Sequence, residues 1–323
     1  MQHSQPEKDI KKDINRAEQK RSELTSSLSE QGYVTDKSLI SSLFLLNELG
    51  KPLLIEGEAG VGKTEIAKCL AQANNRVLIR LQCYEGLDAQ HALYDWDYQR
   101  QLLAIQMTGT ATSQTNHKDH TAQLKNTLYS EDFLLKRPLF AAIASEQPVV
   151  LLIDEIDRAD QEFEALLLEV LSDFQISVPE LGTFKARSQP AVILTSNGIR
   201  ELSDALRRRC LYHYIDYPDV QKEQQIIKAR LPGIDENLTK QVVSYVQKLR
   251  TVGLRKTPGV AESIDWASAL MSIGIIDLHS EPLLTESTLS CLIKTRNDLE
   301  LLKHEHAALY TDESADRHSP ENQ

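Results

Sequence analysis

The sequence has little of what marks a secreted or membrane-spanning chain. Its four cysteines lie far apart, with no C-x-x-C pair among them, so no disulfide framework is indicated. No apolar run approaches ~20 residues, the length of a membrane-spanning helix. The N-terminal residues MQHSQPEKDIKKDINRAEQK contain no apolar core of a secretion signal. These absences predict a cytoplasmic protein whose thiols are reduced.

Positive charge is also scarce. Lysine and arginine number 36 against 47 acidic residues, a net charge of −11, so no global basic field recruits nucleic acid or anionic membrane. A local basic patch is still allowed. Histidine pairs His117/His120 and His304/His306 lie in polar or charged segments, and we expect solvated side chains there rather than metal ligands.

The strongest positive feature is the stretch GEAGVGKT at residues 57–64. It follows the apolar run 52–55 and opens into a helical pattern, the strand–loop–helix context of a phosphate-binding loop. Backbone N–H groups and the helix N-terminus make a concave site for phosphate oxygens, and glycines permit its backbone angles. A chance glycine-rich turn is the alternative. The expected nucleotide-binding residues are Gly57, Glu58, Ala59, Gly60, Val61, Gly62, Lys63, Thr64 and Glu65.

The cofactor indicated by this loop is ATP with Mg²⁺. Lys63 can reach the β and γ phosphates, and Thr64 can place its hydroxyl on Mg²⁺. A second element, VVLLIDEID at residues 149–157, has five apolar residues ahead of acids, which describes a buried parallel strand. Asp154 then suits a role toward Mg²⁺, and Glu155 can polarise the attacking water. Alone, these acids could simply be solvated at a strand end.

The chain divides by pattern into four parts. Residues 1–30 are polar and predict a frayed helix or mobile arm, and residues 31–218 carry the strands and motifs. Residues 219–305 are purely helical in period, with helices predicted at 220–231, 235–249, 260–273 and 286–302. Residues 306–323 are polar and predict an unstructured tail. Within the second part, 131–144 has helical spacing, although Pro138 can start or kink that helix, and 108–122 reads as an exposed loop.

The order of phosphate loop, acidic strand and Asn197 resembles the AAA+ ATPases over residues 30–275. This resemblance implies an α/β fold, a three-layer αβα core with a mainly parallel sheet, followed by a small all-α lid domain. It also implies that Asn197 is a sensor that helps Glu155 hold the water. In ALRRRC, the resemblance puts Arg209 at the position of an arginine finger that reaches the nucleotide of a neighbouring subunit, with Arg208 as the second choice. The alternative for this arginine cluster is a solvated basic surface without a catalytic role.

Long stretches such as CYEGLDAQHALYDWDYQRQLL and LTSNGIRELSDALRRRCLYHYIDYPD are similar to a narrower group, the MoxR family and its CoxD-like branch. That resemblance implies a homo-hexameric ring that couples ATP hydrolysis to remodelling of a client enzyme, often a metalloenzyme. A von Willebrand factor A-domain protein is the usual partner. Many MoxR proteins place an arginine after a proline in the lid as a second sensor, whereas Gly259 follows Pro258 here. Arg255 or Lys256 can substitute, or both are ordinary surface charges.

Three points stay open from the sequence. The aromatics Tyr94, Trp96 and Tyr98 alternate with Asp95 and Asp97, and either pack into a core or form a contact surface. A nucleic-acid motor or clamp-loader-like ATPase is the alternative function, against which the net charge of −11 stands. A nucleotide-gated scaffold with negligible hydrolysis is the third possibility.

Overall fold

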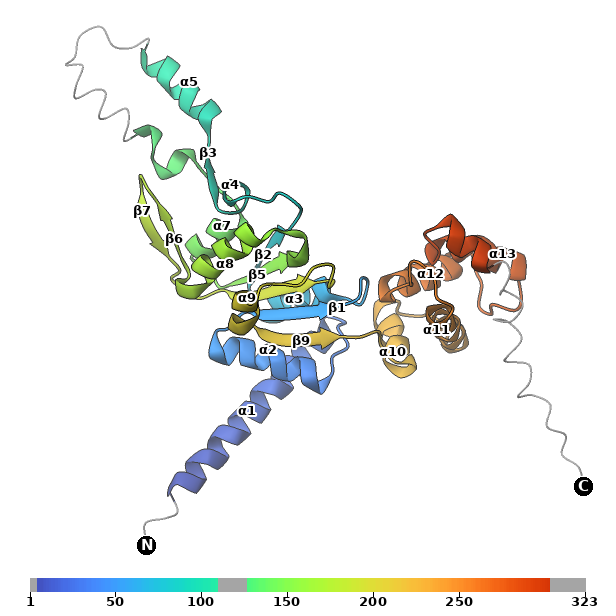
Figure 1. Cartoon of the computed structure of the whole chain (residues 1–323). Coiled ribbons are helices and arrows are strands. Elements are labelled where there is room, and N and C mark those ends of the chain that lie inside the picture. The colour runs from blue at the N-terminus through green and yellow to red at the C-terminus, as the bar shows by residue number, and fades with distance from the viewer. Residues whose placement is uncertain (1–4, 110–126, 303–323) are drawn as a thin grey trace, which may run out of the picture. The chain divides into compact units, whose positions relative to one another are not determined.

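The computed structural model describes residues 5–109 and 127–302 (Figure 1). Its internal contacts divide the chain into two compact units. The first unit comprises the residues up to Gln31, Thr35–Glu56 and Thr64–Tyr214. The second comprises Gly32–Val34, Gly57–Lys63 and the residues from Ile215 onward. The phosphate loop therefore belongs with the C-terminal helices, although it is embedded in the sequence of the first unit.

A five-stranded sheet forms the centre of the first unit, in the order β2-β5-β8-β1-β9. The pairs β2–β5, β5–β8 and β8–β1 are parallel. Two small antiparallel pairs, β3–β4 and β6–β7, stand beside it. The strands are β1 (Leu53–Gly57), β2 (Val77–Gln82), β3 (Tyr94–Trp96), β4 (Leu134–Lys136), β5 (Val149–Asp154), β6 (Gln175–Val178), β7 (Gly182–Lys185), β8 (Ala191–Ser196) and β9 (Leu211–Ile215).

Helices flank this sheet, and the expected α/β core with a mainly parallel sheet is confirmed. Every residue of β5 is buried, which explains why its sequence is a continuous apolar run. Leu151 and Ile153 pack in one core with residues of α7 and α8, and α2 contacts β8. The helices before the linker to the second unit are α1 (Gln5–Glu30), α2 (Lys37–Leu49), α3 (Lys63–Ala73), α4 (Ala89–Ala92), α5 (Tyr98–Gly109), α7 (Pro138–Ala144), α8 (Gln161–Asp173) and α9 (Asp204–Arg209), with 3₁₀ turns η1 (Glu131–Phe133) and η2 (Ile156–Arg158).

Local signals set the ends of these helices. The Asp36 side chain accepts from the N–H of Leu39 at the start of α2, and Gly50 ends that helix in the left-handed region at φ 62°. Asp160 caps α8 in the same way, through the N–H of Phe163. Caps of this kind satisfy backbone donors that have no partner within the helix.

The N-terminal segment, for which the sequence predicts a frayed helix or mobile arm, forms the helix α1 over residues 5–30, and its last turns contain buried leucines. Leu28 is 1% exposed and Leu24 is buried, whereas Ile14 is 51% exposed. The last turns of α1 contact α2. Among the side chains of α1 whose burial is described, from residue 14 onward, the buried leucines lie near its end.

Of the readings left open for 131–144, the one in which Pro138 starts the helix is confirmed, and helical structure does not extend over the whole segment. The segment begins as η1 and β4, and only from Pro138 does it continue as the helix α7. Leu134–Lys136 pair with Tyr94–Trp96, so a partner strand distant in sequence decides the conformation. Trp96 and Tyr94 pack edge-on against Tyr129 and Phe140, as the structural reading of the aromatic segment expected. Tyr98, by contrast, is 58% exposed, and most of the expected loop at 108–122 lies outside the described residues.

The second unit is helical, as expected. Its helices are α10 (Val220–Arg230), α11 (Glu236–Thr251), α12 (Val260–Ser272) and α13 (Pro282–Thr288), followed by the 3₁₀ turn η3 (Leu289–Cys291). The predicted single helix over 286–302 is wrong: α13 gives way to η3, and helical structure resumes only at Arg296. Leu289, Leu292 and Leu302 all join the core of this unit. The four histidines named above and the tail 306–323 lie outside the described residues.

No helix among residues 5–109 and 127–302 is long and apolar enough to cross a membrane.

Candidate functional site

The loop 57–63 is stabilised by its own lysine. Lys63 is 6% exposed, and its Nζ donates to the carbonyl oxygens of Gly57 at 2.7 Å and Glu58 at 2.6 Å. Gly60 and Gly62 have φ angles of 79° and 95°, which L-residues with a Cβ rarely adopt. A Cβ on Gly57 would lie 2.1 Å from the Ile215 oxygen. The three glycines are therefore required by backbone geometry and close approach.

The next residue in the chain, Thr64, contacts the acid at the end of β5. Its Oγ1 donates to Asp154, with distances of 3.0 and 3.3 Å to the two carboxylate oxygens. Asp154 is buried and also accepts from Arg80 Nε and Nη2, at 3.0 and 2.6 Å, and from Thr195 Oγ1 at 2.6 Å. Burying a carboxylate is costly unless donors of this kind satisfy its oxygens. The structure thus brings together the two residues predicted to face Mg²⁺.

Glu155, the predicted base, has an unusual backbone conformation. Its φ and ψ are 56° and 50°, the left-handed region, which costs a non-glycine residue about 1 kcal/mol or more. Its N–H donates to Thr195 Oγ1 at 2.9 Å. Its carboxylate accepts from Gln82 Nε2 at 3.1 Å and Arg158 Nε at 2.8 Å. Three contacts, one at its backbone and two at its carboxylate, hold Glu155 in this conformation.

Asn197 follows β8, the strand beside β5. Its backbone N–H and that of Ile199 both donate to Asp157 Oδ2 at 3.0 Å. Asp157 is buried in the turn just after Glu155. The segment carrying the predicted sensor is therefore tied, through its backbone, to the segment carrying the predicted base.

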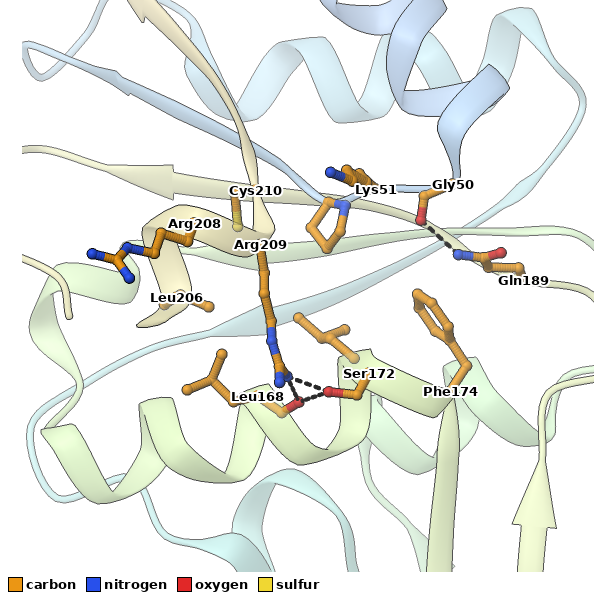
Figure 2. Close-up of a pocket in the computed structure, with 12 residues that line it drawn as sticks. Gly50, Lys51, Leu168, Ser172, Phe174, Gln189, Leu206, Arg208, Arg209 and Cys210 are labelled. Carbon is orange, nitrogen blue, oxygen red and sulfur yellow. Dashed lines mark hydrogen bonds between the residues drawn. The ribbon is translucent and has the colours of Figure 1, made fainter. Parts of the chain in front are cut away.

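The arginines of α9 are placed differently from one another. Arg209 Nη1 donates to the Leu168 carbonyl and to Ser172 Oγ, both on α8. Arg207 pairs with Glu56 at 3.6 Å. Arg208 points away from Arg209 and is exposed (Figure 2), without a hydrogen-bond or ion-pair partner in the described part of the chain. Arg208, Arg209 and Lys51 line a cavity of about 400 Å³.

Arg255 and Lys256, the candidates for a second sensor, make hydrogen bonds through their backbones. The N–H groups of Arg255 and Lys256 donate to the two oxygens of Asp298, at 2.8 and 3.3 Å. Both side chains are exposed. This arrangement fixes the turn before α12 and leaves the two cations at the surface.

Sequence reasoning missed three residues that organise the acids: Arg80, Thr195 and Asp157. Thr195 links Asp154 to the Glu155 N–H, and Arg80 reaches across from the neighbouring strand. The only signal was position, since Thr195 ends one apolar strand and Arg80 lies within another. Which strands are neighbours decides their role, and a single sequence does not state strand order.

The acids also affect a nearby thiol. Burial, together with the carboxylates of Asp154, Asp157 and Glu155, raises the pKa of Cys83 to about 12. Burial alone raises the pKa of Cys210 to about 12. Both thiols stay protonated at neutral pH, so neither is suited to act as a nucleophile.

Comparison with known proteins identifies the domain that carries these residues. The family described as AAA domain (dynein-related subfamily) matches residues 52–210. The match runs from the residue before β1 to the residue after α9. It therefore contains the loop, the acids of β5, Asn197 and the three arginines.

Relatives extend the similarity beyond that domain. An uncharacterized protein of Staphylococcus epidermidis is 27% identical over 225 residues, covering 68% of this chain and 75% of its own length. The gas vesicle ATPase GvpN1 of Halobacterium salinarum is 23% identical and covers 78% of this chain and 76% of its own. Among solved structures, a variant of RuvB from Thermotoga maritima has 18% identity, covers 82% of this chain and 72% of its own, and gives a TM-score of 0.46.

The family match and the gas vesicle ATPase relatives both indicate an ATPase domain, and the parallel α/β fold is consistent with it. The CoxD-like branch has no support among these relatives and stays a prediction. Residues 52–210 therefore form an AAA-type ATPase domain, which is the part of the chain that the family match identifies.

Proposed function

We propose that this chain is a MoxR-type, chaperone-like remodelling ATPase that acts as a ring on a client enzyme or complex. The observation that carries the catalytic half is the contact between Thr64 and Asp154, next to Lys63 in the same helix. Support for the remodelling half comes from the long MoxR-like stretches, and the gas vesicle ATPase relatives support the ATPase activity. We also propose the sequence boundaries: an N-terminal arm to 30, a nucleotide-binding domain 31–218 and a helical domain 219–305.

In this proposal the residues Gly57–Glu65 bind the phosphates of ATP, with Lys63 offsetting their charge. Thr64 and Asp154 fit Mg²⁺, since a hydroxyl and a carboxylate are oxygen donors of the kind it prefers. The ion would offset charge on the phosphates during hydrolysis. Glu155 takes up the proton of the attacking water, and Asn197 helps to hold that water.

Two substitutions test the catalytic roles. Lys63→Ala removes the cation of the loop and is expected to abolish nucleotide binding, measured by fluorescence titration with mant-ATP. Glu155→Gln keeps the shape of the side chain but cannot accept the proton, so binding should persist while phosphate release falls by about 10²-fold or more. Unchanged turnover in Glu155→Gln would remove Glu155 as the base.

We further propose an arginine finger supplied to a neighbouring subunit by Arg209, with Arg208 as the alternative. Both side chains are exposed, but Arg209 must leave Leu168 and Ser172 to reach a neighbour, whereas Arg208 has no such partner among the described residues. Arginine suits the role because its planar fork stays charged and binds phosphate through two donors. A finger acting between subunits requires an oligomer.

The finger is tested by mixing subunits. Arg209→Ala and Arg208→Ala are each mixed with Lys63→Ala, because a mixed ring regains some interfaces with an intact loop and an intact finger. Recovery of ATPase in only one mixture identifies that arginine. Absence of recovery in both, in rings shown to be mixed, contradicts a finger in trans.

Ring formation and the client are tested with the Glu155→Gln protein. We expect a hexamer with ATP, measured by light scattering, and co-purification of a von Willebrand factor A-domain protein together with an enzyme client. ATPase that is instead stimulated by DNA and falls steeply with salt would favour a nucleic-acid motor. Capture of neither protein by the ATP-bound ring would contradict the remodelling role.

A further inference from the structure

Within the second unit, the phosphate loop is bonded to the first turn of α12. The carbonyl oxygen of Gly60 accepts from the N–H of Val260 at 2.9 Å and, more weakly, from that of Ala261 at 3.4 Å. Gly259 is the N-cap of this helix, and Val260 is its first residue. The first N–H groups of a helix have no partner inside it. Here the loop supplies that partner.

This contact is possible only because residue 259 has no side chain. A Cβ on Gly259 would lie 2.7 Å from Gly60 Cα and 2.9 Å from Gly60 C and O, distances that real Cβ atoms do not reach. The φ and ψ of Gly259 are −83° and −174°, which any residue can adopt, so space alone requires glycine. The position where MoxR relatives are expected to carry a sensor arginine is thus closed to side chains.

A buried ion pair holds this turn in place. Arg250 Nε donates to the Pro258 carbonyl at 2.9 Å, and its Nη1 and Nη2 donate to the two oxygens of Glu223, each at 2.7 Å. The side chains of Arg250 and Glu223 are 7% and 0% exposed. A paired fork of this kind has one preferred geometry. Pro258 and Gly259 therefore present α12 to the loop in a fixed position.

The bond also sets the direction of a donor in the loop. In a planar trans peptide, the C=O of Gly60 and the N–H of Val61 point in opposite directions. With the carbonyl held by α12, the Val61 N–H points away from α12. We propose that Gly259 is a positioning residue for ATP: it lets α12 fix the Gly60–Val61 peptide so that the Val61 N–H is turned toward the phosphates. This inference rests on the proposed role of the loop in binding ATP.

The test compares Val260→Pro with Val260→Ala in the full chain. Both lose the valine side chain, but only proline lacks the N–H that Gly60 accepts. Proline is favoured at the first position of a helix, and the extended backbone of Gly259 suits the residue before it. We expect Val260→Ala to bind mant-ATP within about twofold of the unchanged protein, and Val260→Pro about fivefold more weakly. Equal affinity of the two variants, at matched melting temperature, overturns the proposal.

If Val260→Pro does not fold, a second pair of variants tests whether Gly259 positions the loop. Gly259→Ala introduces only the Cβ, and Asp235→Ala removes the N-cap of α11, whose carboxylate accepts from Asn237 and Leu238, without touching the loop. Gly259→Ala should weaken mant-ATP binding, while Asp235→Ala should lower the melting temperature and leave affinity unchanged. If both variants keep full affinity, Gly259 has no positioning role. If the unchanged protein itself does not bind mant-ATP, the proposed nucleotide site fails instead.

Discussion

Cys83 shows how strongly the acids after β5 affect their surroundings. Its N–H donates to the Asp154 carbonyl at 2.8 Å. Its thiol is buried beside three carboxylates, which disfavour a further negative charge on the sulfur. Its pKa is therefore raised from 9.0 to about 12, and burial raises that of Cys210 equally. A group that holds its proton more tightly when folded favours the folded state until pH rises above its unfolded pKa.

This gives a prediction for alkaline stability. Between pH 8 and pH 10 the unfolded thiols ionise while the folded ones do not, so the free energy of unfolding should fall by roughly 1 kcal/mol per thiol. Urea denaturation at both pH values measures the fall. The variant Cys83→Ala with Cys210→Ala should show a fall smaller by about twice that amount. An equal fall in both proteins would mean that the thiols ionise in the folded state.

Among elements, α1 combines two different behaviours in one helix. Leu24 and Leu28 in its last turns are buried and α1 contacts α2, whereas Ile14 is largely exposed. Lys20 adds an ion pair to Glu48 of α2 at 2.5 Å, which is exposed and contributes little. The end of the helix is therefore anchored by apolar burial, with surface charge as a minor addition.

Truncating one apolar side chain in each part of α1 compares how much the two parts contribute to stability. Leu28→Ala deletes a buried side chain and should lower the free energy of unfolding by about 3 kcal/mol. Ile14→Ala, on the exposed part of the same helix, should change it by less than about 0.5 kcal/mol. The urea midpoint with an unchanged slope measures both. Similar losses from the two variants would contradict the packing of α1.

How much the sequence predicts depends on how local the cause is. The apolar run before Asp154 and the helical spacing of 220–231, 235–249 and 260–273 are local patterns, and the strand and helices they predict are present. Leu134–Lys136 adopt a strand because Tyr94–Trp96 lie beside them, and Arg80 serves Asp154 because β2 adjoins β5. Such pairings depend on strand order. The sequence therefore identifies the motifs of the site but not the side chains that support them.

At the scale of the whole molecule, the buried pair of Glu223 and Arg250 is a point where one change has a large effect. Ser263 Oγ and Gln247 Nε2 also donate to Glu223, each at 2.8 Å, so its carboxylate is fully satisfied while Arg250 is present. Removing the arginine alone leaves a buried carboxylate with an incomplete set of partners. The cost of a missing charge in such a pair is larger than the net value of the pair.

We therefore expect Arg250→Met to lower the free energy of unfolding of the second unit by about 3–5 kcal/mol. Adding Glu223→Gln should recover most of that loss, since the second charge is then also removed. Scanning calorimetry measures both proteins, because a chain of two units need not unfold in one transition. A double variant as unstable as Arg250→Met would show that packing, rather than charge, holds this cluster.

The division of the chain has a practical meaning for anyone who wishes to isolate its parts. The boundaries between units fall after residues 31, 34, 56, 63 and 214, so each unit is assembled from separate pieces of the polypeptide. A fragment that ends at Tyr214 would retain the sequence GEAGVGKT but lose the Ile215 carbonyl beside Gly57 and the α12 donors to Gly60. The ATPase motif is short and contiguous in the sequence. A fragment that keeps the loop together with Ile215 and α12 must nevertheless extend from β1 into the C-terminal helices.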